Sequence, residues 1–217
     1  AAAGDFIFAD GFDDIYVLAP YASDGSIPPS PASVKLALST LLSKWDVGFI
    51  VDTTGSMGGE VANLKTSLTA ATIPTLKANI ASLGVGIAGH DDVPYSTYGD
   101  GSGSCGDLPF YRGGYVSTIT NDSFFAVNSL AIHCGSETPE AQVPAIYHAI
   151  TGSGITWPGG SVAPEPPSGA TFGALHFRAD ALPIVISISD ASQHNGKRAL
   201  DKTGTLTTGT MTLERAV

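Results

Sequence analysis

The sequence predicts an α/β protein with a doubly wound, mostly parallel sheet flanked by helices. Three apolar runs, at 47–51, 83–89 and 182–188, have the length and composition of strands that are buried on both faces. Segments with helical spacing of apolar residues lie between them, as in chains that alternate strand and helix around a parallel sheet. The runs at 47–51 and 182–188 lead to Asp52 and Asp190, so two carboxylates are expected at one edge of the sheet.

Composition limits the class of protein and of partner. The chain has 217 residues, 43% of them hydrophobic and 14% charged, which predicts a globular fold with a sizeable core. A net charge of −10 argues against nucleic acid or an anionic membrane as the partner. No apolar run approaches the roughly 20 residues of a membrane-spanning helix. The N-terminus lacks the basic region of a signal peptide, so we expect a mature, secreted or surface protein.

The first part of the chain is expected to be separate from the main domain, which we place at 34–217. Residues 1–33 combine an acidic segment with a proline-rich connector at 26–33. Phe6–Phe8 and Ile15–Leu18 are predicted as two short strands. The acidic residues between them could hold calcium, but a solvated acidic turn is the interpretation we favour; these are Asp10, Asp13 and Asp14.

The first buried run leads directly into a group of oxygen-bearing side chains. Asp52, Thr54 and Ser56 alternate over five positions, which places three oxygens on one side of a tight loop. Hard oxygen ligands suit a hard divalent cation. An apolar stripe then predicts a helix with a possible kink at Pro74, and it consists of Val61, Leu64, Leu68, Leu76 and Ile80. The loop therefore lies between a strand's carboxyl end and a helix N-terminus, where open α/β sheets bind ligands.

The middle of the chain predicts further elements in order. The strand at 83–89 ends at His90, and 110–118 alternates like an edge strand. Asp122 is a suitable N-cap for a helix through Ile132. A second helix is predicted to end at Ile150, with Thr138 before it, and the Gly- and Pro-rich excursion at 153–167 is expected to form a surface rim that carries Trp157.

The two cysteines are expected to form one disulfide. Cys105 and Cys134 both lie in predicted loops, and an even count in an exported chain favours pairing. Closing a loop of this size stabilises a protein by about 3.5 kcal/mol in the chain-entropy model. Two free thiols in a cytosolic protein are the alternative.

The stretch 47–57 resembles the metal-ion-dependent adhesion site of von Willebrand factor A domains, the fold that integrin ligand-binding domains also use. The family pattern is Asp, any residue, Ser or Thr, any residue, Ser. In this chain the pattern falls on Asp52, Thr54 and Ser56. The family takes two further ligands from later loops.

Both later ligands have a match. Thr138, in the sequence SETPEA, corresponds to the family's Thr before a helix, although it would serve equally as an N-cap in any protein. Asp190, after the run 182–188, corresponds to the final Asp. Of the accessory metal site known beside the main one, only Glu60 remains. The resemblance covers about 45–217, and it implies that the C-terminal part of the domain is missing or is supplied by another segment or chain.

The resemblance implies a binding function without catalysis. Thr54 and Ser56 would hold the cation directly, Thr138 directly or through water, and Asp52 and Asp190 largely through water. We expect Mg²⁺, with Mn²⁺ or Ca²⁺ as alternatives, and a partner protein that offers an Asp or Glu carboxylate. With neutral hydroxyls innermost, the cation keeps positive charge for that carboxylate.

Three other functions remain open at the level of sequence. The protein could be a structural subunit that self-assembles into a surface fibre. It could be a metal-dependent hydrolase with His90 or His194 as the base. The segment 201–207, DKTGTLT, has the letters of the P-type ATPase phosphorylation motif, in which Asp201 would accept phosphate. The residues before Asp201 do not form the buried strand that this chemistry needs, so we set phosphoryl transfer last.

Overall fold

The structure, a computed structural model, describes residues 7–9, 15–17, 43–95, 97–102, 105–136 and 139–193. The chain divides into two units, Ala1–Thr40 and Leu41–Val217. In the first unit, β1 (Ile7–Ala9) and β2 (Ile15–Val17) pair antiparallel, with Ile7 opposite Val17. They lie within one residue of the two predicted strands. The acidic residues predicted between them lie outside the described residues.

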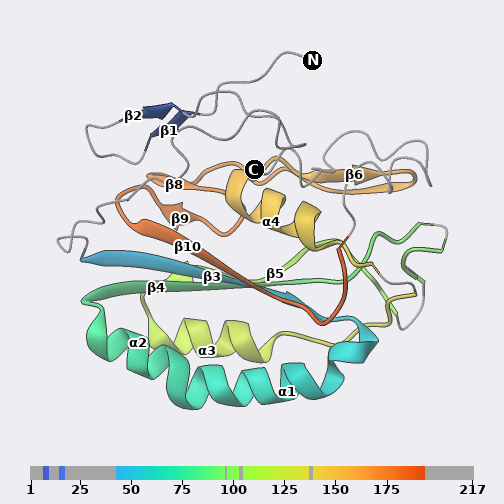
Figure 1. The fold of residues 1–217 in the computed structure, drawn as a ribbon, viewed down its shortest axis with the longest axis horizontal. Helices are drawn as coiled ribbons and strands as arrows, with labels where there is room; N and C mark the ends of the chain where they lie inside the picture. Colours follow the sequence, from blue (N-terminus) through green and yellow to red (C-terminus); the bar gives the residue numbers. More distant parts are fainter. Residues whose placement is uncertain are drawn as a thin grey trace, which may run out of the picture. The chain divides into compact units, whose positions relative to one another are not determined.

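The second unit is built on a four-stranded mixed sheet with the order β10-β3-β4-β5 (Figure 1). The three apolar runs form the strands β3 (Lys44–Asp52), β4 (Ser82–His90) and β10 (Leu182–Ile188), which are mutually parallel. The edge strand β5 (Tyr111–Ser117) runs antiparallel to β4. The α/β class is thus confirmed, with one antiparallel edge.

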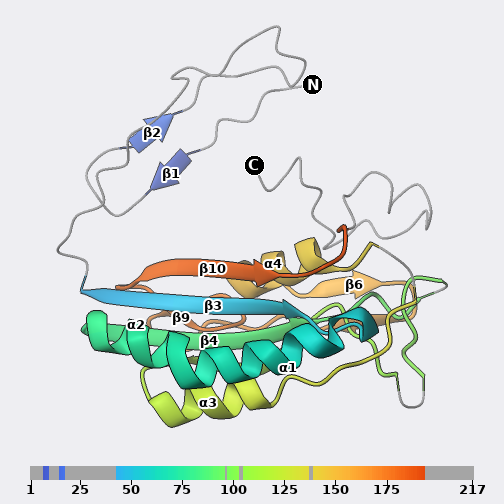
Figure 2. The ribbon, with the colours of Figure 1, turned by 60° about the horizontal axis from the view of Figure 1, so that its bottom comes forward.

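Helices cover both faces of the sheet (Figures 1 and 2). One face carries α1 (Gly58–Ser67), α2 (Ile73–Asn79) and α3 (Thr120–Asn128). The other face carries α4 (Gln142–Thr151) and two small hairpins, made by β6 (Ile155–Trp157) with β7 (Gly160–Val162) and by β8 (Thr171–Phe172) with β9 (Phe177–Arg178). Each face has its own cluster of buried apolar side chains. None of the described helices has the length and apolar character needed to cross a bilayer.

The irregularity predicted at Pro74 takes the form of a π-type turn. A short 3₁₀ turn (Gly55–Met57) leads into α1, and a π turn (Leu68–Thr72) joins α1 to α2, in whose first turn Pro74 lies. Proline has no N–H to give to the preceding turn, and the wider turn accommodates that loss.

Two local predictions were wrong. Ile119 is the N-cap of α3, so Asp122 lies inside the first turn, and the helix ends at Asn128 instead of Ile132. Trp157 is only 7% exposed and packs in the cluster beneath α4 instead of forming a rim. In each case tertiary packing overrides the local capping or loop signal.

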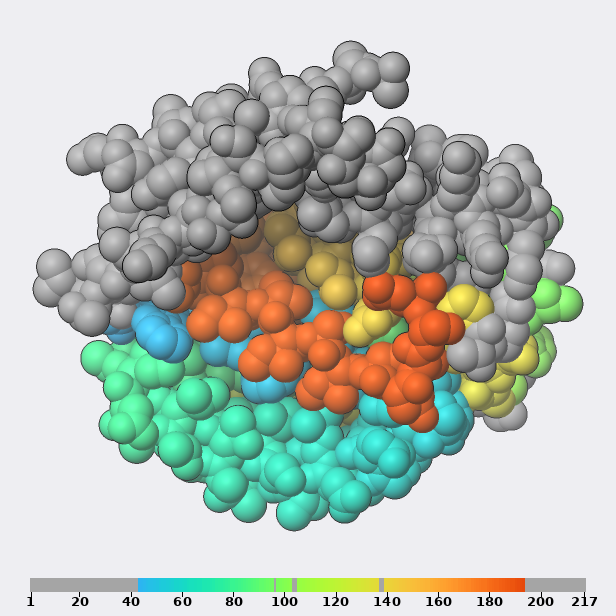
Figure 3. Space-filling model, viewed as in Figure 1, coloured from blue at the N-terminus to red at the C-terminus, as the bar shows by residue number. Residues whose placement is uncertain are grey.

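Strand β10 differs from the expectation of a strand buried on both faces. None of its residues is fully buried: Pro183 and Ile186 are exposed, Ile186 to 39%, and the other five are half-buried. Within the part of the chain that the structure describes, β10 pairs only with β3 and forms an edge of the sheet. Atoms of β10 accordingly lie on the surface in Figure 3.

Candidate metal site

Asp52 is the last residue of β3, and its buried carboxylate organises the loop that follows. Oδ1 accepts hydrogen bonds from the Thr54 backbone N at 3.0 Å and from Thr54 Oγ1 at 2.7 Å. Oδ2 accepts one from Ser189 Oγ at 2.6 Å. Asp52 is 0% and Thr54 2% exposed, so these donors satisfy a carboxylate that has no contact with water.

Parallel pairing of β3 with β10 brings the second part of the site to the first. Ile188 pairs with Val51, so the residues after both strands leave the sheet at the same edge. There, Ser56 Oγ donates a hydrogen bond to Asp190 Oδ1 at 3.1 Å, and both residues are exposed. The structure therefore brings four of the predicted ligands to this edge in two hydrogen-bonded sets, Asp52 with Thr54 and Ser189, and Asp190 with Ser56.

Thr138, His194 and Asp201 lie outside the described residues. Glu60, the predicted accessory ligand, lies exposed in the first turn of α1.

A pocket of about 210 Å³ opens beside the loop after β3. One wall comes from this loop and the other from the segment after α3; the lining residues are Thr54, Gly55, Ser56, Cys134, Gly135, Ser136 and Glu140. Gly135 has a φ of +68°, and a Cβ there would lie 2.9 Å from Thr54 Cβ. Only glycine combines that backbone conformation with such a close approach.

Glu140 lines this pocket, although it is not among the residues predicted from the sequence. It is 5% exposed, and its Oε2 has no hydrogen-bond partner among the described residues. Burial, and secondly the carboxylates of Asp92 and Asp52, raise the pKa of Glu140 to about 8. Its position two residues after Thr138, in the loop already predicted to supply a ligand, is the signal that could have identified it.

A second network of polar side chains is centred on Thr53, in the same loop, and on Asp91. Thr53 Oγ1 donates to Asp91 Oδ1 at 2.6 Å, and Tyr111 OH donates to Thr53 Oγ1 at 3.0 Å. His133 Nδ1 lies 2.7 Å from Asp91 Oδ2. Burial raises the pKa of Asp91, an effect that the Thr53 and His133 contacts oppose, and burial raises the pKa of Tyr111 to about 12. The network fixes the backbone on either side of Thr53.

His90 is also buried at this edge. It pairs with Asp52 across β3 and β4 and is 0% exposed. Burial lowers the pKa of His90, although the charge of Asp52 acts in the opposite direction. His90 does not line the pocket. A neutral, enclosed imidazole is poorly placed to serve as a base for a substrate in that pocket.

The donor set fits a hard cation. Hydroxyl and carboxylate oxygens line or border the pocket, and Glu140 contributes a buried carboxyl oxygen that has no hydrogen-bond partner among the described residues. Across the described ranges, no three His, Cys, Asp or Glu side chains converge as a ligand group. A cation held here would thus depend on the hydroxyls of Thr54 and Ser56 as well as on carboxylates.

Compared with models of known protein families and with curated protein sequences, the chain gives no match. The geometry and chemistry of the pocket are therefore the basis for any proposal of function.

Proposed function

We propose that the pocket binds a divalent cation, Mg²⁺ in the first place, and that the protein uses it to capture an Asp or Glu carboxylate of a partner protein. Asp52, Thr54, Ser56 and Asp190 would hold the cation, with Thr138 as the ligand predicted from sequence. The observation that carries the proposal is the hydrogen bond from Ser56 to Asp190, because it joins two loops separated by 134 residues at the mouth of the pocket. A bound cation would supply concentrated positive charge for a partner's carboxylate.

Binding is favoured over catalysis by the kinds of side chain that line the pocket. Thr54 and Ser56 bring hydroxyls, but the described pocket lining contains no histidine or lysine that would activate one as a nucleophile. The hydrolase hypothesis would have to depend on His194, because His90 is enclosed. The space of about 210 Å³ exceeds the roughly 30 Å³ share of one water, so it can take a small polar group of a partner.

Assembly into a fibre is the second candidate, and the edge of β10 favours it. Among the described strands β10 has one neighbour, and its apolar Ile186 is 39% exposed. An exposed apolar edge is a template for pairing with another strand. Size-exclusion chromatography with and without chelator separates the candidates. A protein that only captures a partner elutes as a monomer under both conditions, whereas a fibre-forming protein elutes as a polymer, which dissociates in chelator if cations bridge it and persists if its strands pair.

Calorimetric titration of Mg²⁺, Mn²⁺ and Ca²⁺ into chelator-stripped protein tests the proposal. We expect saturable binding in the natural protein, its loss in Asp52→Ala and a clear weakening in Asp190→Asn. The matched control is Asp180→Asn, which removes a carboxylate paired with Lys44 and exposed to solvent. Full affinity in Asp52→Ala would refute the site, and loss of binding in Asp201→Ala alone would favour the phosphoryl-transfer hypothesis. With cation bound, a Glu-containing peptide should bind more tightly than its Gln counterpart.

A further inference from the structure

One wall of the pocket is a short segment tied to the loop after β3 by backbone hydrogen bonds. Gly55 N donates to Cys134 O at 2.9 Å, and His133 N donates to Thr53 O at 2.9 Å. Of the two segments, 130–136 has no helix or strand of its own. The position of Cys134 and Gly135 therefore sets the width of the pocket on the side opposite Thr54.

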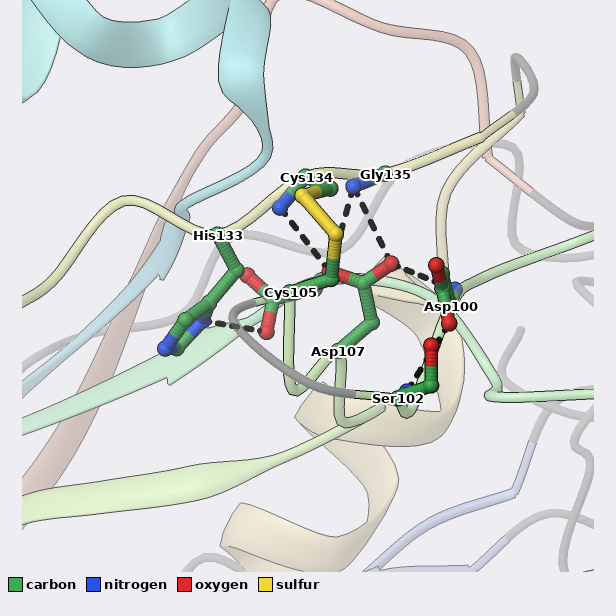
Figure 4. Close-up of a disulfide and its surroundings, with 8 residues drawn as sticks. Asp100, Ser102, Cys105, Asp107, His133, Cys134 and Gly135 are labelled. Carbon is green, nitrogen blue, oxygen red and sulfur yellow. Dashed lines mark hydrogen bonds and ion pairs between the residues drawn. A yellow bond between two sulfur atoms is a disulfide. The ribbon is translucent and has the colours of Figure 1, made fainter.

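The predicted disulfide is confirmed, and it tethers this wall of the pocket. Cys134 is bonded to Cys105 with a sequence separation of 29 residues. Cys105 comes shortly before β5, so the bond ties the wall to a different part of the chain (Figure 4). Cys134 is exposed and Cys105 half-buried, which leaves the bond open to attack by a thiolate from solvent.

Asp107 holds the wall independently of the disulfide. It is 0% exposed, and its Oδ1 accepts hydrogen bonds from the backbone N of Cys134 at 3.0 Å and of Gly135 at 3.1 Å. Its Oδ2 accepts from Asp100 N at 2.7 Å and again from Gly135 N at 3.1 Å. Figure 4 shows this carboxylate directly beneath the wall, beside the disulfide. One buried side chain thus fixes the same two residues that the disulfide tethers.

We propose that the Cys105–Cys134 disulfide is a thiol-sensitive latch on the pocket wall, with Asp107 as the positioning residue that keeps the wall in place when the latch opens. The inference rests on the proposed function for its effect on cation binding. A dithiol reductant opens the bond in two exchanges. A thiolate of the reductant attacks one cysteine sulfur to give a mixed disulfide, and the second thiol of the reductant then displaces that cysteine. Two electrons and two protons pass to the cysteines, and the reductant becomes a disulfide.

Opening the latch lowers the affinity of the pocket without unfolding the domain. The wall then relies on Asp107 and on the backbone bonds to Thr53 and Gly55, and it samples wider positions. A closed wall and a bound cation favour one another, so the coupling is reciprocal: reduction weakens cation binding, and the cation protects the disulfide by the same factor. We expect a factor of about ten, within the usual range of such couplings.

Amide hydrogen exchange of metal-free protein tests the latch without any cation. After treatment with dithiothreitol, the amides of Cys134 and Gly135 should exchange faster while peptides from β3 and β4 stay protected. The double variant Cys105→Ser with Cys134→Ser should reproduce this, and adding Asp107→Asn should accelerate exchange further. Unchanged exchange at Cys134 and Gly135 overturns the latch, and so does uniform loss of protection in β3 and β4, which would mean that the disulfide supports the whole fold.

Mn²⁺ titration of the oxidised and reduced proteins supplies the second measurement. Affinity about tenfold lower after reduction supports the latch, and equal affinity overturns it. If the oxidised protein binds no Mn²⁺ at all, the proposed function fails, and hydrogen exchange still decides whether the disulfide controls the wall. A matched control is Asp122→Asn in α3, an acidic residue bonded to Ser117 and not to the wall, which should leave both measurements unchanged.

Discussion

Strand β3 carries a fully buried aspartate near each end, and the two carboxylates have different kinds of hydrogen-bond donor. Asp46 and Asp52 are both 0% exposed. Asp46 faces a guanidinium, because Arg178 donates from Nε at 2.8 Å and from Nη2 at 2.6 Å to its Oδ1. Asp52 receives only the Thr54 amide and two hydroxyls, and no described lysine or arginine forms an ion pair with it.

The difference indicates which end of the sheet is suited to bind a cation from solvent. At the amino end the ion pair is complete, and Gly84 leaves room for it, since a Cβ there would lie 2.3 Å from Asp46 Oδ1. At the carboxyl end, the negative charges of Asp92 and Asp52 repel a charge on Glu140 and contribute, after burial, to its raised pKa. A cation at this end would relieve that repulsion, whereas one at the amino end would find no unbalanced charge.

The largest expected effect on stability comes from removing the ion pair at the amino end of β3. Asp46→Asn leaves the Arg178 guanidinium without its counter-charge, and we expect the free energy of unfolding to fall by about 3 kcal/mol. Cation affinity should not change, because Asp46 lies six residues before Asp52 at the other end of the strand. Urea denaturation and calorimetric titration measure the two quantities.

The matched control for this change is Asp180→Asn. Asp180 pairs with Lys44 close to the same end of the sheet, but both side chains are largely exposed, 63% and 46% respectively, so the change in stability should be small. If Asp46→Asn destabilises no more than Asp180→Asn, the amino end is not the self-contained ion pair described above.

A smaller effect is expected from Glu140→Gln in metal-free protein. The pKa of Glu140 is about 8 in the folded state against an ordinary value of 4.5, so the folded protein keeps a proton that the unfolded chain releases between these values. Stability therefore falls as pH rises from 4.5 towards 8. The Gln variant lacks this fall and should be more stable than the natural protein at pH 9 by about 2 kcal/mol.

Glu60→Gln is the control for Glu140→Gln, because Glu60 is exposed in α1. It should leave the pH dependence of stability as it is in the natural protein. The free energy of unfolding of the natural protein and of Glu140→Gln could instead change equally with pH between 4.5 and 8. That result would show that Glu140 ionises at little cost and that the carboxylates at the carboxyl end repel one another less than we infer.

How much of this arrangement could be predicted depends on the range of the interactions involved. The strands β3 and β4 could be predicted because each contains a run of consecutive apolar residues. The polar residues that follow each strand could be predicted with them, because they are adjacent in the sequence. The contact between Ser56 and Asp190 could be anticipated because parallel strands end at a common edge. The disulfide was predicted from an even number of cysteines, both in predicted loops, in a chain expected to be exported.

The features that were missed depend on contacts between distant segments. Glu140 looks like an acid before a helix, and only burial among other carboxylates raises its pKa. Asp107 looks like a loop aspartate, and its role arises from the amides of Cys134 and Gly135, at 27 and 28 residues' distance. The ion pair between Asp46 and Arg178 spans 132 residues. Nothing in the local sequence distinguishes Asp46 and Asp107 from solvated carboxylates.

The smallest effect, and the one that compares the two ends most directly, is expected from Ser189→Ala. Ser189 Oγ donates to Asp52 Oδ2 at 2.6 Å, so its loss leaves that oxygen unpartnered and should cost about 1 kcal/mol in metal-free protein. The matched change at the amino end is Ser82→Ala, which removes the hydroxyl that accepts from Arg178 Nη1 at 2.8 Å.

Saturating Mg²⁺ should separate these two serine variants. A cation beside Asp52 would compensate the oxygen that Ser189→Ala leaves bare, so the loss of stability should shrink when Mg²⁺ is present. The loss caused by Ser82→Ala should stay the same, because Arg178 and Asp46 already balance one another. Urea denaturation of both variants with and without Mg²⁺ gives the comparison. An equal response of the two variants to Mg²⁺ would mean that the cation does not act on Asp52, and that the two ends of β3 differ in their donors without differing in function.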